Sequence, residues 1–298
     1  MQSMTGAENR ENLRIAAVMG HADQAEMLRG CISHHLAAGC DAIFVSLNRD
    51  DEESAAVVDE ISSSAEVKGA PVREFARSEF DFLTDAVRKA NCLFRPDYIL
   101  VIDSDEFCVA ESGGLKRVLS LSSADLLSVP RYNAALTMDG EANRDDPKVT
   151  LSTRVIRRLN ERQAQHFTAL RPELSWLASR IGPKIIVRPA AVKRVRRGGH
   201  AIDSEKLPIV PATATSLAIV HFPFTTLDRF KDKLEGIRAR IGSFESGEAG
   251  HWRSWLRTVE EGRLEELFTA QFFTTNEVEM LEGKGLIESI GSILRRAA

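Results

Sequence analysis

The chain lacks several features that would place it in a specialised class of protein. No apolar run approaches the ~20 residues that a helix needs to cross a bilayer, and residues 1–14 contain no apolar core typical of a secretory signal. The 39 Lys and Arg nearly balance the 43 Asp and Glu, so no broad basic surface for nucleic acid is expected. We therefore expect a cytoplasmic protein that contacts a membrane at most peripherally and does not bind nucleic acid.

Cysteine is also scarce, with Cys31, Cys40, Cys92 and Cys108 as the complete set. No pair has the Cys-x-x-Cys spacing, so the pattern favours neither a zinc site nor a disulfide framework. The four residues fall in segments that otherwise look apolar, and we expect reduced thiols, most of them buried. A glycine-rich phosphate loop near the N-terminus is absent as well, which disfavours a nucleotidyltransferase.

What the first third of the chain does contain is an alternation of strand and helix patterns. Short apolar runs of strand length occupy residues 13–19, 42–47 and 98–102, and helical patterns occupy residues 23–38, 52–64 and 80–94. This alternation predicts an α/β fold, in which a mostly parallel sheet is flanked by helices on both faces. In such sheets ligands bind at the carboxyl ends of the strands.

The remainder is less regular. Further strands are expected at residues 126–131, 184–188 and 217–222, and further helices at residues 227–241, 252–272 and 285–296. We expect a catalytic domain over residues 10–225 and a C-terminal helical extension over residues 226–298. An apolar stripe on the last helix is expected to pack on the chain's own core, with a homodimer face as the alternative.

The strand at residues 98–102 runs directly into Asp103, Ser104 and Asp105. Side chains alternate along an extended chain, so the two aspartates are expected to point the same way. Two neighbouring carboxylates repel each other, and a divalent cation with oxygen ligands relieves that repulsion. The sequence therefore predicts a metal site at this strand end, where the ion can neutralise a diphosphate leaving group; the alternative is a solvated acidic loop.

Four passages, in order along the chain, resemble the GT-A glycosyltransferases of the broad family 2-like group. They are ISHHLAAGCDAIFV at residues 32–45, YILVIDSDEF at residues 98–107, KIIVRP at residues 184–189, and VHFPF at residues 220–224 followed by Leu227 and by FKDK at residues 230–233. The second passage is the specific one. The resemblance implies a GT-A fold, which is the fold of the nucleotide-diphospho-sugar transferases, and an enzyme of the hexosyltransferase type.

The resemblance further implies that a sugar moves from a nucleotide-diphosphate donor, a UDP-sugar in the first instance, with Mn²⁺ or Mg²⁺ as cofactor. Asp103 and Asp105 would hold the metal, and His221 is our choice for its third ligand. On the donor side we place His21, Asn48, Asp50, Ser104, Lys184 and His200. The acceptor, whether a glycan, a lipid-linked sugar or a protein, is not indicated. His34 and His35, inside a helix pattern, are expected to be structural.

The catalytic base of an inverting transferase would be a carboxylate. Glu173 is our candidate, because it lies near Trp176, and an aromatic ring often forms the platform for a sugar. The other candidates are Asp139, Glu141 and Asp203.

Two alternatives to a glycosyltransferase stay open. Leu47 stands where many relatives have an acid, and the usual Asn-Glu after the first strand is missing, so the chain could be a degenerate GT-A fold that serves as a binding or scaffold protein. A metal-dependent phosphotransfer enzyme also places Asp-x-Asp after a strand. There, however, the nucleophile normally follows the first strand.

Overall fold

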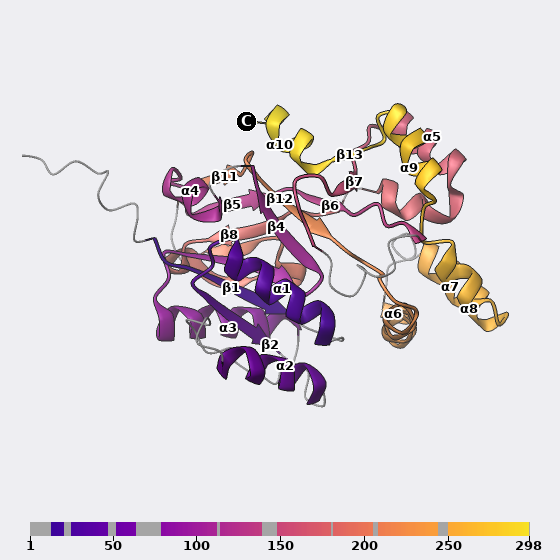
Figure 1. The fold of residues 1–298 in the computed structure, drawn as a ribbon. Coiled ribbons are helices and arrows are strands. Elements are labelled where there is room, and N and C mark those ends of the chain that lie inside the picture. The colour runs from indigo at the N-terminus through magenta and orange to yellow at the C-terminus, as the bar shows by residue number, and fades with distance from the viewer. Residues whose placement is uncertain are drawn as a thin grey trace, which may run out of the picture.

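The computed structural model describes residues 13–20, 25–46, 52–63, 79–111, 114–138, 148–179, 181–204, 208–243 and 250–297. The chain is built around a six-stranded sheet with the order β11-β5-β8-β3-β1-β2 (Figure 1). Its strands are β1 (Ile15–Gly20), β2 (Ala42–Ser46), β3 (Tyr98–Asp103), β5 (Leu126–Val129), β8 (Lys184–Val187) and β11 (Pro211–Thr213). Five strands run in one direction and β8 runs against its two neighbours, so the predicted mostly parallel α/β sheet is confirmed.

Both faces of the sheet are covered by helices, because alternate side chains of each strand point to opposite faces. On one face, Ile15 and Met19 of β1 share a buried core with Leu28 of α1 (Ala25–Ala37). On the other face, Val18 packs in a second core with Val87 of α3 (Glu79–Phe94). The helix α2 (Glu52–Ser63) adds Val58 to the first core. The three predicted helices of this region are therefore present.

A three-stranded sheet packs beside the large one, in the order β4-β12-β6. Its strands are β4 (Glu106–Ala110), β6 (Arg131–Asn133) and β12 (Leu217–His221), and β12 pairs antiparallel with β4 and parallel with β6. The sequence analysis did not predict β4. It also predicted one strand over residues 126–131, whereas β5 and β6 are separate on either side of Pro130. Proline lacks an N–H to donate to a strand ladder.

The C-terminal part contains α6 (Leu227–Arg240), α7 (Gly250–Glu260), α8 (Leu264–Thr269), α9 (Thr275–Gly283), β13 (Ile287–Ser289) and α10 (Ile290–Ala297). The single helix expected over residues 252–272 is wrong, because the chain breaks between α7 and α8 at Gly262, whose φ is +78°. Such a left-handed conformation favours glycine and does not continue a helix.

The helix expected over residues 285–296 is also wrong in its first turn. The segment Ile287–Ser289 forms the strand β13, which pairs antiparallel with β7 (Arg154–Ile156). The helix α10 begins only at Ile290. The apolar stripe nevertheless packs inside the molecule as expected, since Ile290 and Leu294 belong to the same core as β1.

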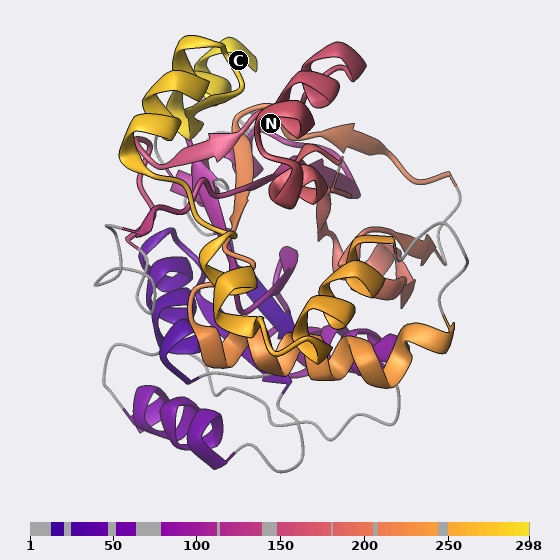
Figure 2. The same ribbon diagram turned by 90° about the vertical axis from the view of Figure 1, so that its right-hand side faces the viewer.

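The remaining elements are α4 (Gly114–Ser120), α5 (Glu161–Leu170), β9 (Val192–Val195), β10 (Ile202–Ser204) and the short 3-10 helices η2 (Pro172–Ala178), η3 (Pro189–Ala191), η4 (Arg197–Gly199) and η5 (Ile241–Ser243). In Figure 1 the helices α5 to α9 gather on the right of the molecule, away from α2 and α3; Figure 2 shows the same groups from that side.

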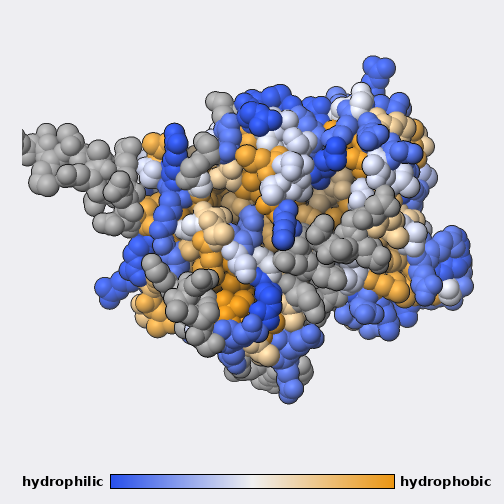
Figure 3. Space-filling view, viewed as in Figure 1, coloured by the Kyte–Doolittle hydropathy of each residue, from blue (hydrophilic) through white to orange (hydrophobic). Residues whose placement is uncertain are grey.

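The outer surface is mixed in character. On the face drawn in Figure 3, hydrophilic residues cover most of the surface, and smaller hydrophobic patches lie between them. Among the described residues, no helix has the length and apolar character needed to cross a membrane.

The four cysteines are free thiols, and three of them, Cys31, Cys40 and Cys108, are buried as expected.

Candidate functional site

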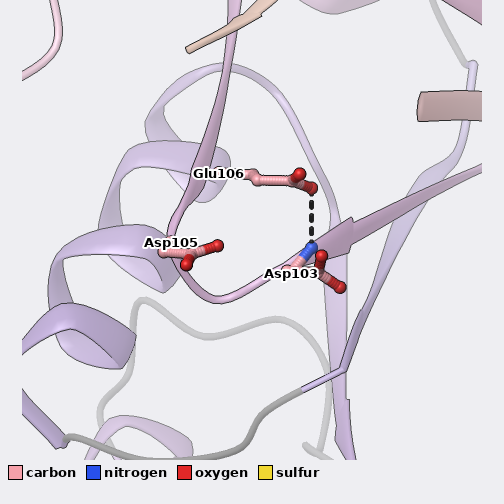
Figure 4. Close-up of side chains that lie close together, drawn as sticks. All are labelled: Asp103, Asp105 and Glu106. Carbon is pink, nitrogen blue, oxygen red and sulfur yellow. Dashed lines mark hydrogen bonds between the residues drawn. The ribbon is translucent and has the colours of Figure 1, made fainter. Parts of the chain in front are cut away.

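The acidic turn, residues 103–106, lies at the carboxyl end of β3, where a ligand site is expected in an α/β sheet. β3 ends at Asp103, and β4 begins at Glu106. The buried Ser104 donates its backbone N–H to Gly20 O at 3.2 Å, which fastens the turn to the end of the neighbouring strand β1. Carboxylate oxygens of Asp103, Asp105 and Glu106 lie within 4.8 Å of one another (Figure 4).

Glu106 anchors this turn from beneath. Its side chain is fully buried, and Oε1 lies 2.5 Å from Arg131 Nη1. Oε2 lies 3.1 Å from Lys184 Nζ and accepts the backbone N–H of Asp103 at 2.9 Å, the bond dashed in Figure 4. Burial alone would raise the pKa of Glu106, but Lys184 and Arg131 outweigh it and lower that pKa below its ordinary value. Both oxygens are committed to the protein, so Glu106 is a structural anion.

Lys184 lies between two of the acids. Its Nζ donates to Asp103 Oδ2 at 2.7 Å and to Gly198 O at 2.8 Å, besides the contact with Glu106. The side chain is 1% exposed, so all three N–H groups of the ammonium are used inside the protein. The sequence analysis placed Lys184 on the donor side. The structure shows it holding Asp103 and Glu106 together, and contact with a nucleotide stays a prediction.

Gly199 allows the chain to close over Lys184. Its φ is +65°, and a Cβ there would lie 2.8 Å from Val101 Cγ1 and 3.8 Å from Lys184 Nζ. A larger residue would therefore be strained both in its backbone and in its contact with β3.

Asp105 is held from the other side by α6 and β12. Its carboxylate forms a close ion pair with Arg229, and Oδ2 lies 3.6 Å from His221 Nε2. Arg229 also donates to Phe222 O at 3.0 Å, so the guanidinium is itself fixed. Burial opposes the charged form of Asp105, but Arg229 and His221 together hold its pKa well below the ordinary range.

His221 is oriented by Asn133, a buried residue of β6. His221 Nδ1 lies 2.8 Å from Asn133 Oδ1. With that oxygen as acceptor, Nδ1 donates the hydrogen bond, and Nε2 faces Asp105 Oδ2. A hydrogen-bond partner on the far ring nitrogen is typical of metal-binding histidines.

The charges of the site balance without any ion. Asp103, Asp105 and Glu106 face the cations Lys184, Arg131 and Arg229 in the contacts above. Lys184 and Arg229 offset part of the expected repulsion between the carboxylates, but burial, together with the nearby Glu106 and Asp105, still raises the pKa of Asp103. Two carboxylate oxygens, Asp103 Oδ1 and Asp105 Oδ1, form no hydrogen bond or ion pair with the described part of the chain. Of the three acids whose oxygens lie close enough to share one ion, Asp103 and Asp105 each keep a free oxygen and Glu106 does not. His221 as a third ligand stays a prediction.

Three other histidines of the described structure have contacts of their own. His200 Nδ1 lies 2.6 Å from Pro183 O, beside the strand that carries Lys184, and burial lowers its pKa. His35 is buried beneath β4, where Nε2 accepts the N–H of Cys108 at 3.2 Å and Nδ1 donates to Cys31 O at 2.8 Å. Burial lowers the pKa of His35 to about 3. His34 Nε2 donates to Cys108 O at 2.8 Å, so both helix histidines have structural contacts.

The carboxylates proposed as the catalytic base are not brought to the turn by any contact in the described structure. Glu173 lies on η2 and pairs with Arg171, which also binds Glu277 at 3.1 Å. Trp176 donates to Gln271 and packs among aromatic rings. Asp203 accepts from Arg196 at 2.8 Å. The role of Glu173 stays a prediction. Outside the described residues lie His21, Asn48, Asp50, Asp139 and Glu141.

Sequence reasoning missed four residues of the site: Glu106, Arg131, Asn133 and Arg229. Glu106 stands inside one of the passages that carried the resemblance, and Arg229 lies between two parts of another, so their position was a usable signal. Arg131 and Asn133 had no such signal, because a short strand of three residues gives no clear alternation.

Comparisons with known proteins were made for sequence and for structure. No family model and no curated protein sequence matches this chain. Similar solved structures include HddC from Yersinia pseudotuberculosis complexed with GMP-PN, at 12% identity and a TM-score of 0.40, over 76% of this chain and 99% of that one. S. aureus TarS 1-349 in complex with UDP-GlcNAc has 13% identity and a TM-score of 0.37, over 91% and 76%.

A third similar structure is glucosyl-3-phosphoglycerate synthase from Mycobacterium tuberculosis in complex with Mn²⁺, UDP and phosphoglyceric acid. It has 14% identity and a TM-score of 0.35, over 83% of this chain and 86% of that one. Likenesses at this level decide neither the activity nor the ligand of this chain. Those questions depend on its own residues.

Proposed function

We propose that the chain is a GT-A glycosyltransferase that moves a sugar from a nucleotide-diphosphate donor, with a UDP-sugar as the first candidate. One observation carries the proposal: three of the four passages that resemble the family meet at the acidic turn, and the first contacts β4, the strand that follows this turn. Lys184 of the third passage contacts Asp103 of the second at 2.7 Å, His221 of the fourth lies 3.6 Å from Asp105, and His35 of the first binds the N–H of Cys108.

This convergence matters because the contacting residues are far apart in sequence. His35 and Cys108 are separated by 73 positions, and Lys184 and Asp103 by 81. A solvated acidic loop would need none of these buried contacts. Polar residues drawn from separate segments to one strand end instead match the constellation expected of an active site.

A divalent cation, Mn²⁺ or Mg²⁺, belongs to this proposal, with Asp103, Asp105 and His221 as its protein ligands. The ion would supply positive charge for the donor diphosphate. The protein's own part is to hold the ligands: Lys184 fixes Asp103 Oδ2, and Asn133 fixes the ring of His221. Ser104 and His200, with His21, Asn48 and Asp50, are proposed for the donor side.

The test is the thermal stability of the purified protein with UDP, GDP or ADP, each with and without Mn²⁺. A ligand that binds only the folded state raises the unfolding midpoint, by roughly 2.7 kcal/mol of stabilisation at 100 times its Kd. We expect one nucleotide to act, and to need Mn²⁺. Asp103→Asn should remove the Mn²⁺-dependent rise in the unfolding midpoint, because asparagine keeps the shape of this half-exposed side chain but not its charge.

The matched control is Asp203→Asn, because Asp203 is a similarly exposed aspartate that pairs with an arginine, Arg196, on another strand pair. It should respond to nucleotide as the original chain does. A well-folded protein that responds to no nucleotide, with or without metal, contradicts the proposal.

A second candidate is a degenerate GT-A fold that serves as a binding or scaffold protein. The balanced charges favour it, because Lys184 and Arg229 already occupy the two aspartates that would bind a metal. For such a protein we expect no Mn²⁺-dependent response to nucleotide in the same titration.

A further inference from the structure

A pocket of about 210 Å³ has Arg131 and Asn133 in its lining. It is lined by β6, by the chain just after β7, and by the end of η2. Its polar lining residues include Arg131, Tyr132, Asn133, Arg157, Arg158 and Ser179, and none of the lining residues is acidic. Sites for drug-sized ligands measure roughly 300 to 1,000 Å³, so this pocket suits one part of a ligand.

The pocket shares a wall with the site described above. Arg131 lines the pocket and also donates to Glu106 Oε1 at 2.5 Å. Asn133 lines it too and contacts His221 Nδ1 at 2.8 Å. A group bound in the pocket would therefore lie one side chain away from both Glu106 and His221.

Three polar groups of the lining have no hydrogen-bond partner in the described part of the chain. Arg131 Nε is buried and unpaired, which costs free energy unless a ligand or water accepts its proton. The hydroxyl of Tyr132 and the exposed guanidinium of Arg158 are likewise without one, and Arg158 contacts the Tyr132 ring at 5.6 Å. All three groups can donate.

The local charge is positive. The charged groups that act on Tyr132 are Arg158, Arg296 and Arg157, against the single acid Glu288. Burial raises the pKa of Tyr132, so its hydroxyl remains a proton donor at neutral pH. Arg157 is held in place by Glu288 at 3.2 Å and by Gly285 O at 2.9 Å.

We propose that this pocket binds an anionic group, a phosphate or a carboxylate, of the acceptor molecule. The assignment of this group to the acceptor rests on the proposed function. The anion site itself rests on the unpaired donors, the positive charge and the absence of acids in the lining. Arginine is suited to both oxyanions because its planar fork can donate two parallel bonds. Bound there, the acceptor would be positioned next to His221 and Asp105.

The same chemistry could come from the donor's diphosphate, so the experiment has separate arms. Inorganic phosphate and acetate are titrated without metal at constant ionic strength, with chloride as the reference salt, and UDP with Mn²⁺ is titrated in parallel. Binding is followed by isothermal titration calorimetry. The variants are Arg158→Ala and Tyr132→Phe. Both residues can be changed without breaking any ion pair or hydrogen bond within the described structure.

We expect Arg158→Ala to weaken binding of phosphate or acetate about tenfold, as for the loss of one charge-assisted bond, and Tyr132→Phe to weaken it a few-fold. UDP binding should be unchanged in both. The control is Arg154→Ala, on β7 near the pocket but outside its lining and paired with Glu282. It should leave all three arms unchanged.

The anion that binds more tightly, phosphate or acetate, identifies the kind of group that the pocket prefers. Two results would overturn the assignment. One is no measurable binding of either anion to the original chain. The other is a loss of UDP binding in Arg158→Ala as large as its loss of anion binding, which would show that the pocket binds the donor diphosphate. Failure of UDP binding alone, with anion binding intact, would instead contradict the proposed function and leave the anion site standing.

Discussion

Lys184 and Glu106 face each other beneath the acidic turn, with Nζ and Oε2 3.1 Å apart and both side chains completely buried or nearly so. Neither charge reaches solvent. Each is neutralised by the other together with Asp103 and Arg131. The partly exposed carboxylate of Asp103 is thus held by Lys184, whose other partners are buried. The geometry of the site therefore depends on residues that no ligand touches.

Lys184→Met should destabilise the protein by about 3 to 5 kcal/mol, because it leaves Glu106 with only part of its compensation in a buried position. Urea unfolding followed by far-UV circular dichroism measures this. Lys193→Met, at an exposed position of β9, is the control and should change the unfolding midpoint little. A double variant with Glu106→Gln should recover part of the loss; strict additivity would show that the two groups are not coupled.

The protein should lose stability as the pH is lowered from about 6.5 toward 3, partly through His35. Burial lowers its pKa to about 3 in the folded chain, against the ordinary value of 6.5. Between those values the unfolded chain binds a proton that the folded chain does not, which lowers stability by up to about 1.4 kcal/mol per pH unit. In His35→Gln the slope of unfolding free energy against pH between 6.5 and 5 should be shallower by up to that amount.

The slope above pH 7.5 is the internal control for this pH prediction, because there His35 is neutral in both states. The two proteins should have parallel profiles in that range, whatever the constant difference between them. Parallel profiles between pH 5 and 6.5 as well would contradict the assignment of a neutral, buried His35.

Asn133→Ala should weaken Mn²⁺ binding by roughly 10- to 100-fold, the usual effect of removing the partner that orients a metal-binding histidine. Electron paramagnetic resonance of free Mn²⁺ gives the affinity. The control is Asn160→Ala, which removes the N-cap of α5 and should cost about 1 kcal/mol of stability with no change in Mn²⁺ affinity. Equal Mn²⁺ affinities for the original chain and Asn133→Ala would remove His221 from the ligand set.

Gly199→Ala should be more harmful than Gly262→Ala, although both glycines have positive φ. The added Cβ at position 199 meets Val101 Cγ1 at 2.8 Å, whereas at position 262 nothing lies within 4 Å. We expect about 1 kcal/mol for the backbone strain alone at Gly262 and a further 1 to 3 kcal/mol for the clash at Gly199. Thermal unfolding of the two variants measures the difference; equal losses would mean that Val101 moves aside freely.

The sequence predicted the parallel sheet well, because β1, β2 and β3 are buried on both faces and therefore read as continuous apolar runs. It failed where local signals compete with tertiary contacts. Ile287–Ser289 looks like the start of a helix, yet it is drawn into a strand by pairing with Arg154–Ile156, more than a hundred residues away. A local sequence pattern does not predict a strand partner so far away in the chain.

The sequence likewise predicted only part of the site, namely its acids and not the arginines that pair with acids. Asp103 and Asp105 were visible because acids directly after an apolar strand are unusual, whereas the cations that pair with them, Lys184 of β8 and Arg229 of α6, come from two other elements. Arg131 and Arg229 look like ordinary surface arginines in the sequence, and only the fold shows that they are 12% and 11% exposed. A charge balance of this kind is a three-dimensional property, so the sequence argument for a metal was incomplete.

The pairing of β13 with β7 has a consequence for how the polypeptide matures during synthesis. Ile290 and Leu294, directly after β13, belong to the same core as β1 and β3, so that core is incomplete until residues 290–294 have left the ribosome. Contacts this distant in sequence form slowly, and chains generally fold from the N-terminus as they emerge. A nascent chain halted before residue 287 would therefore lack Ile290 and Leu294 in this core, and we expect ligand binding to begin only after that segment has emerged.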